Sequence, residues 1–82
     1  MSQLEKALRK LLSLPTEMRY EEIKAILERF GFVGTEVGSS HITYRKDGRM
    51  NVTIPRHGDI SRVYIKMVRD AIIEVMKNEK KP

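Results

Sequence analysis

The stretch GSSHITYRKDGRMNVTIPR, residues 38–56, decides the fold because the hydrophobic period of the chain changes there. Apolar and polar residues alternate in SHITYR and again in NVTIP, which is the pattern of half-buried strands. Glycine and serine precede the first segment, and KDGR, typical of a tight turn, joins the two. The stretch therefore predicts two antiparallel strands, and FVGTEVG at 32–38 predicts a third strand before them.

The facing of these strands follows from the alternation of side chains between the two faces of a sheet. Ile42 and Val52 are apolar and have to meet on the buried face. A two-residue turn would bring Ile42 opposite Thr53, which is on the wrong face, whereas a three-residue turn at 46–48 with Gly48 at positive φ corrects the mismatch. The predicted pairs are then Ile42 with Val52, Tyr44 with Met50, and His41 with Thr53.

This facing places His41 on the open, polar face of the sheet. The same face is predicted to carry Thr43, Arg45, Asn51 and Thr53. An exposed position is what a histidine needs if it is to meet a large substrate.

Helical periodicity flanks the strands on both sides. SQLEKALRKLLSL at 2–14 predicts a first helix with Ser2 as its N-cap and Pro15 beyond its end. Residues 20–30 predict a second helix that ends at Gly31, and residues 61–78 predict a third. The expected fold is α+β and forms a single domain over 1–82: a helical extension at 1–18, a core at 19–78 and a frayed tail at 79–82.

Composition limits the function classes. The chain has 82 residues, a formal net charge of +5 and a pI near 9.7, which favours a polyanionic partner such as nucleic acid. It has no cysteine, so disulfides and thiolate zinc sites are excluded, and few aromatic residues, which disfavours a stacking platform for single strands. The N-terminus lacks the apolar region of a signal peptide, and no apolar run reaches the roughly 20 residues that span a bilayer. A cytoplasmic protein without membrane contact is expected.

His41 is the main catalytic candidate. An imidazole can take and give a proton near neutral pH, and the 2′-hydroxyl of RNA is a poor nucleophile until a base takes its proton. The alternative is that His41 is a solvated strand residue without a catalytic role. His57 is interpreted first as a loop residue that bonds to backbone, and an accessory role as acid or base is the alternative. The spacing of the two histidines and Asp59 does not indicate a metal site.

Basic and small residues surround the predicted hairpins. Lysine or arginine can hold a scissile phosphate, and a small-residue turn lets a phosphate approach backbone N–H groups. The candidate RNA contacts are Ser39, Ser40, Arg45, Lys46, Arg49 and Arg56. A solvated rim of charge is the alternative interpretation of the basic residues.

Four segments taken in order resemble the HicA toxins, the small mRNA interferases of bacterial toxin–antitoxin pairs. They are ILERFGF, GSSHITYR, DGRMNVTIPRHGDI and the closing helix, and the resemblance covers residues 20–76. Its most specific parts are the Gly-Ser-x-His turn at 38–41 and the Val-Thr-Ile-Pro-Arg-His run at 52–57. Two features depart from the family. About eighteen residues precede the helix with which family members usually begin. The last helix opens with Val63-Tyr64-Ile65 in place of a Gly-Thr-Leu-like segment.

The resemblance implies a fold like a double-stranded-RNA-binding domain, with a helix, three strands and a helix. It implies endonucleolytic cleavage of mRNA without a cofactor, with His41 at the position of the family's catalytic histidine. It also implies a HicB-like antitoxin that covers the toxin's site. The residues alone leave two alternatives open: a non-catalytic RNA-binding domain of the same fold, and a protein-interaction module that docks through its first helix.

Overall fold

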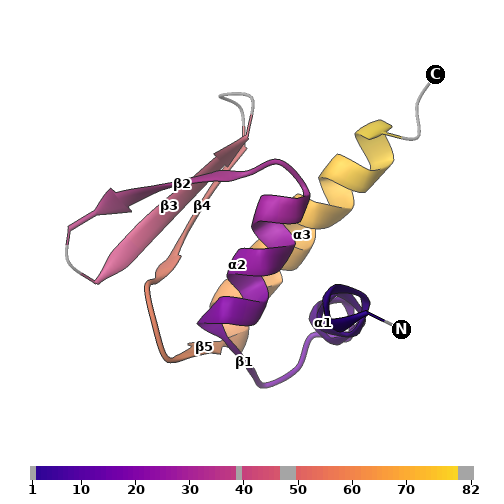
Figure 1. Ribbon diagram of the computed structural model, residues 1–82, viewed down its shortest axis with the longest axis horizontal. Coiled ribbons are helices and arrows are strands. Elements are labelled where there is room, and N and C mark those ends of the chain that lie inside the picture. Colours follow the sequence, from indigo (N-terminus) through magenta and orange to yellow (C-terminus); the bar gives the residue numbers. More distant parts are fainter. Residues whose placement is uncertain (1, 39, 47–49, 80–82) are drawn as a thin grey trace.

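The computed structural model describes residues 2–38, 40–46 and 50–79 (Figure 1). The elements in chain order are α1 (Gln3–Leu12), β1 (Glu17–Arg19), α2 (Tyr20–Arg29), β2 (Val33–Val37), β3 (His41–Lys46), β4 (Met50–Pro55), β5 (Asp59–Ser61) and α3 (Arg62–Glu79). None of the described helices is long and apolar enough to cross a membrane.

The central sheet is antiparallel with the strand order β2-β3-β4, and β1 and β5 form a separate two-stranded pair. In Figure 1 the three-stranded sheet lies on one side of the molecule and the helices lie on the other. The fold is therefore α+β and resembles a double-stranded-RNA-binding domain, which confirms the fold class predicted from sequence.

The helix ends follow the predicted local signals. Ser2 caps α1, because its hydroxyl accepts the Glu5 N–H at 3.1 Å. Gly31 follows the end of α2 with φ +90°, a backbone conformation that glycine adopts without strain. The first helix stops at Leu12, before Pro15, and Leu14 then takes φ +55°.

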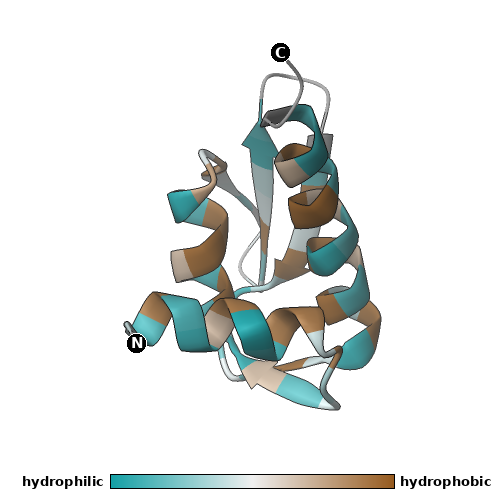
Figure 2. Ribbon diagram, turned by 90° about the vertical axis from the view of Figure 1, so that its right-hand side faces the viewer, coloured by the Kyte–Doolittle hydropathy of each residue, from teal (hydrophilic) through white to brown (hydrophobic). Residues whose placement is uncertain are grey.

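One hydrophobic core joins all three helices to the covered face of the sheet. Apolar and polar segments alternate along the helices (Figure 2), as expected for amphipathic helices packed on one side. The buried apolar side chains include Ala7, Leu11, Met18, Ile23, Ile26, Leu27, Phe32, Tyr44, Val52, Ile54, Ile60, Ile65, Val68, Ile72 and Val75. The segment before α2 contributes the first three, so it packs into the same core as the rest.

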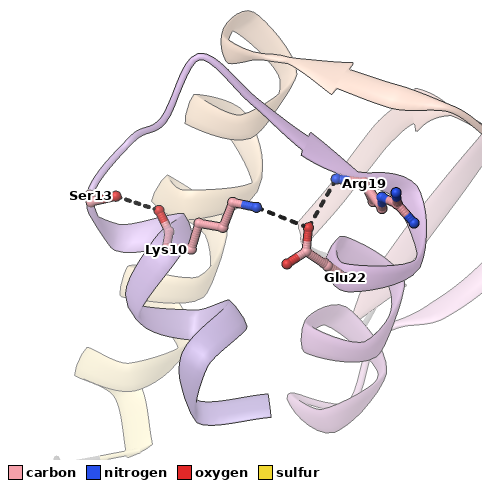
Figure 3. A network of polar contacts seen from close by, with 4 residues as sticks. All are labelled: Lys10, Ser13, Arg19 and Glu22. Atoms are coloured by element: carbon pink, nitrogen blue, oxygen red, sulfur yellow. Dashed lines mark hydrogen bonds and ion pairs between the residues drawn. The ribbon is translucent and has the colours of Figure 1, made fainter. Parts of the chain in front are cut away.

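A polar contact ties α1 to the start of α2 (Figure 3). One carboxylate oxygen of Glu22 accepts both the Arg19 backbone N–H at 3.1 Å and the Lys10 ammonium at 3.3 Å. The first bond satisfies a free N–H at the helix start, as in a capping box. The second contact, between Lys10 and Glu22, is half-exposed and therefore adds little to the free energy of folding. Its main effect is on the orientation of α1 relative to α2.

The pairing of β3 with β4 differs from the predicted register by two residues. The observed pairs are His41 with Pro55, Ile42 with Ile54, Thr43 with Thr53, Tyr44 with Val52, Arg45 with Asn51, and Lys46 with Met50. The predicted pairs of Ile42 with Val52, Tyr44 with Met50 and His41 with Thr53 are wrong. A shift of two residues keeps every side chain on its face, so alternation could not distinguish the registers. Lys46 belongs to β3 and not to the turn, and the predicted conformation of Gly48 lies outside the described residues.

The pair formed by β1 and β5 was not predicted. Met18 lies opposite Ile60, and both side chains are buried. Each strand has three residues and only one buried side chain, so neither shows a hydrophobic period by itself. This pair brings the entry to α2 beside the entry to α3.

Candidate functional site

The face of the sheet that points away from the helices is called the open face below. Its described side chains follow from the register and from alternation along each strand. They are Val33, Thr35, His41, Thr43, Arg45, Asn51, Thr53 and Pro55. None of these eight is acidic, although the chain carries 11 aspartate and glutamate residues. Among these described side chains, a polyanion therefore meets no negative charge.

His41 begins β3 and is exposed, as predicted. It lies between Val37 of β2 and Pro55 of β4 in the register. Tyr44 and Ile54, on the opposite face, are buried with the helices. The sheet thus fixes the backbone of His41 and leaves its side chain on the surface.

Arg45 and Lys46 are neighbours in sequence but lie on opposite faces. Arg45 is exposed on the open face, opposite Asn51. Lys46 turns to the helix side, where its ammonium donates to the Phe30 carbonyl at 2.8 Å, beside Gly31. This contact places a positive charge at the C-terminal end of α2, where the helix dipole favours it.

Ser40 and Arg56 continue the ladder by one step, because the Arg56 N–H donates to the Ser40 carbonyl at 2.9 Å. That position places both side chains on the helix side of the sheet. The Arg56 guanidinium pairs with Glu36 at 2.6 Å, and both side chains are partly exposed. The structure therefore does not place Arg56 or Ser40 on the same face as His41.

A polar cavity of about 400 Å³ lies between α2 and the sheet on this helix side. Arg56, Glu36 and Glu28 line it, together with the paired hydroxyls of Tyr20 and Tyr44, which lie 2.7 Å apart. Burial raises the pKa of Tyr44, and the hydrogen bond with Tyr20 raises it further. Tyr44 is therefore a neutral structural residue at physiological pH.

Three predicted site residues remain: His57, Ser39 and Arg49. His57 is exposed in the bend between β4 and β5. Ser39 and Arg49 lie outside the described residues. Among the residues that are described, no group of three histidine, aspartate or glutamate side chains could hold a metal ion.

Sequence reasoning missed a direct contact between Thr43 and Thr53. The two hydroxyl oxygens lie 2.7 Å apart on the open face, between His41 and Arg45 along β3. Thr43 is almost completely buried, with 5% of its surface exposed, and Thr53 is half-buried. Alternation along the strands already places both threonines on the open face, but only the correct register places them directly opposite each other.

Comparison with known proteins gives one match. The family described as HicA toxin of bacterial toxin-antitoxin matches residues 20–74, which is more than half of the 82 residues. The matched range begins at α2 and ends within α3, so it contains the sheet and His41. Searches of curated proteins and of solved structures gave no significant match. The chain therefore belongs to the HicA family of toxins from bacterial toxin–antitoxin systems.

Proposed function

We propose that this toxin is an endoribonuclease that cleaves mRNA without a metal ion and uses His41 as its acid–base residue. The observation that carries the proposal is the place of His41: it is exposed on the open face, which also presents Arg45 and has no carboxylate among its described side chains. Membership of the HicA family supports the same reading, since its members are mRNA-cleaving toxins.

Cleavage requires that one proton is removed from the ribose 2′-hydroxyl and that one proton is supplied to the leaving 5′-oxygen. His41 would take the proton of a ribose 2′-hydroxyl, and the resulting oxygen would attack the adjacent phosphorus while the bond to the 5′-oxygen breaks and that oxygen takes a proton from water. Alternatively, protonated His41 would give its proton to the leaving 5′-oxygen while water takes the proton of the 2′-hydroxyl. A well-placed acid or base of this kind contributes about 10²–10⁴ in rate.

Arg45 is the proposed phosphate contact. It shares the open face with His41 and is exposed, and no carboxylate lies among the described side chains of that face. Lys46 is already bonded to the Phe30 carbonyl and Arg56 to Glu36, both on the helix side, so we leave these two outside the proposed RNA path. Ser39, Arg49 and an accessory part for His57 remain predictions.

The antitoxin is the second proposed partner. Toxins of this family act with an antitoxin, and we propose a HicB-like protein that covers the open face and excludes RNA from His41. Such a partner would present acidic side chains, because the open face carries Arg45 and no described carboxylate.

A non-catalytic RNA-binding domain is the alternative. It is favoured by the fact that His57, the second histidine, lies in the bend beyond β4, so the described strands of the sheet carry one histidine and not two. RNA binding without cleavage would support this alternative.

Incubation of the purified toxin with a long single-stranded RNA in EDTA tests the proposal. Attack by the 2′-oxygen predicts fragments that end in a 2′,3′-cyclic phosphate and begin with a 5′-hydroxyl. Intact RNA under conditions where the protein binds it would replace the nuclease with the RNA-binding alternative. Cleavage that EDTA abolishes would contradict the metal-independent mechanism.

A further inference from the structure

The hydroxyl pair of Thr43 and Thr53 has a donor to spare. Two hydroxyls joined by one hydrogen bond use one of their two O–H groups and leave the other free. Within the part of the chain that the structure describes, the pair makes no other side-chain hydrogen bond. One polarised O–H group is therefore left for a molecule outside the protein.

Burial decides which of the two hydroxyls is the free donor. Thr43 is only 5% exposed, and a buried O–H has to find its acceptor within the protein. The Thr53 oxygen, 2.7 Å away, is that acceptor. The O–H of half-buried Thr53 is then free to point out of the open face.

The pair lies between the two groups that the proposed reaction uses. Along β3, His41, Thr43 and Arg45 succeed one another at steps of two residues, roughly 7 Å each. On β4, Thr53 lies opposite Thr43 and Asn51 lies opposite Arg45. These five residues form a continuous polar track over β3 and β4.

The half of the open face over β2 has a different character. Val33, opposite Arg45, is 68% exposed and apolar. Thr35, opposite Thr43, is exposed, and its hydroxyl makes no side-chain hydrogen bond among the described residues. A strand of RNA finds charge and oriented donors over β3 and β4, and little of either over β2.

We propose that Thr53 is a substrate-binding residue, whose O–H donates to a phosphate oxygen of the RNA strand between Arg45 and His41, and that Thr43 positions it. This inference rests on the proposed function, since it takes RNA to be the ligand of the open face. It assigns the path of the bound RNA backbone, which runs along β3 and passes Arg45, Thr53 and His41.

The test measures the affinity of a fluorescently labelled single-stranded RNA in a His41→Ala background, where the RNA stays intact. Thr53→Val removes the hydroxyl but keeps the β-branched shape, and it should weaken binding at least about tenfold, as expected for one hydrogen bond to a charged oxygen. Thr53→Ser should restore most of the affinity. Thr35→Val is the matched control, because it makes the same change in the same row of the sheet, and it should leave the affinity unchanged.

Salt dependence separates a lost contact from damaged structure. Removing a neutral hydroxyl displaces no counterion, so Thr53→Val should keep the log–log salt slope, whereas Arg45→Gln should reduce its magnitude by about 0.7–0.9. Thr43→Val leaves the Thr53 hydroxyl in place and should weaken binding less than Thr53→Val does. Thermal unfolding confirms that each variant is folded at the assay temperature.

Two failures are distinguishable. If Thr53→Val binds RNA as tightly as Thr35→Val while Arg45→Gln is weaker, the hydroxyl pair is only structural and the inference is wrong, but the RNA site stands. If the parent protein with intact His41 neither binds nor cleaves RNA, the proposed function fails, and this inference fails with it.

Discussion

At the scale of single residues, Gly34 shows how tightly the covered face is packed. A Cβ atom at Gly34 would lie 2.9 Å from Ile42 Cδ1 and 2.9 Å from Tyr44 Cε1. In an unhindered strand, Gly→Ala stabilises by about 0.4–1 kcal/mol because it restricts the unfolded chain. Here Gly34→Ala should instead lower the free energy of unfolding by about 1–3 kcal/mol through overpacking, as measured by urea denaturation. An increase in stability would show that the Tyr44 ring can move aside.

Tyr44 should also make stability depend on alkaline pH. Because burial and the Tyr20 hydrogen bond raise its pKa in the folded state, folding favours the protonated phenol. This contribution is complete below the unfolded pKa of about 10 and is lost as the pH rises above it. Tyr44→Phe should cost about 0.5–1.5 kcal/mol at neutral pH, and the difference from wild type should shrink above about pH 10. Thermal unfolding across that range is the measurement, and parallel profiles for the two proteins would contradict it.

Alternation along a strand correctly predicted the exposure of His41 and the residues that share its face, but not its cross-strand partner. The face of a side chain depends only on odd or even position, whereas the cross-strand partner depends on the length of a turn that tolerates a shift of two residues. Arg45 and Lys46 were both proposed as phosphate contacts, although alternation itself separates them. The bond from Lys46 to the Phe30 carbonyl could not be foreseen, because it depends on where α2 ends relative to the sheet.

At the scale of elements, the three helices and the sheet were predictable because each has a clear period. The β1 and β5 pair was not, since each strand is recognisable only beside its partner. The pairing of β1 with β5 also makes the segment before α2 part of the folded core. Met18 of β1 is 1% exposed and packs against the core opposite Ile60. Arg62 at the start of α3 also reaches back to the Pro15 carbonyl at 3.3 Å.

Two adjacent leucines in α1 test whether this helix completes the core. Leu11 is fully buried, whereas Leu12 is 39% exposed. Leu11→Ala should lower the free energy of unfolding by about 2–5 kcal/mol, the usual cost of a buried leucine. Leu12→Ala makes the same chemical change one residue later and should cost less than about 1 kcal/mol.

Denaturation curves of the two leucine variants provide the comparison. Equal losses would mean that α1 packs loosely and that the core is complete without it. Folded Leu11→Ala protein, kept below its melting temperature, should retain RNA cleavage, because α1 contributes no residue to the open face.

At the scale of the whole molecule, the carboxylates of this chain, whose net charge is +5, are not evenly spread. The described side chains of the open face include no carboxylate, whereas Glu21, Glu22 and Glu28 lie together on α2 beside α1. Composition predicted an affinity for polyanions but not this segregation, because only the fold determines which charges share a face. RNA should therefore meet less repulsion on the open face than beside these three carboxylates.

The salt dependence of RNA affinity measures how many phosphates the protein contacts. Three or four contacts predict a log–log slope of about −2 to −4. Arg45→Gln should reduce the magnitude of the slope by about 0.7–0.9, whereas Lys46→Gln should leave it unchanged, since that lysine binds the end of α2. A slope that changes in Lys46→Gln and not in Arg45→Gln would place the RNA on the helix side of the sheet and contradict this prediction.

The central claim is that His41 moves the proton in RNA cleavage, and one assay tests it most directly. Cleavage of a long RNA in EDTA is compared for wild type, His41→Ala and His57→Ala, each confirmed as folded by circular dichroism. His41→Ala changes an exposed strand residue, so its stability should stay within about 0.5 kcal/mol of wild type while its cleavage rate falls at least about a hundredfold. His57→Ala, the matched loss of the other histidine, should lower the cleavage rate less than His41→Ala does, because His57 is proposed only as an accessory acid or base. A folded His41→Ala protein that cuts RNA at the wild-type rate would contradict the claim.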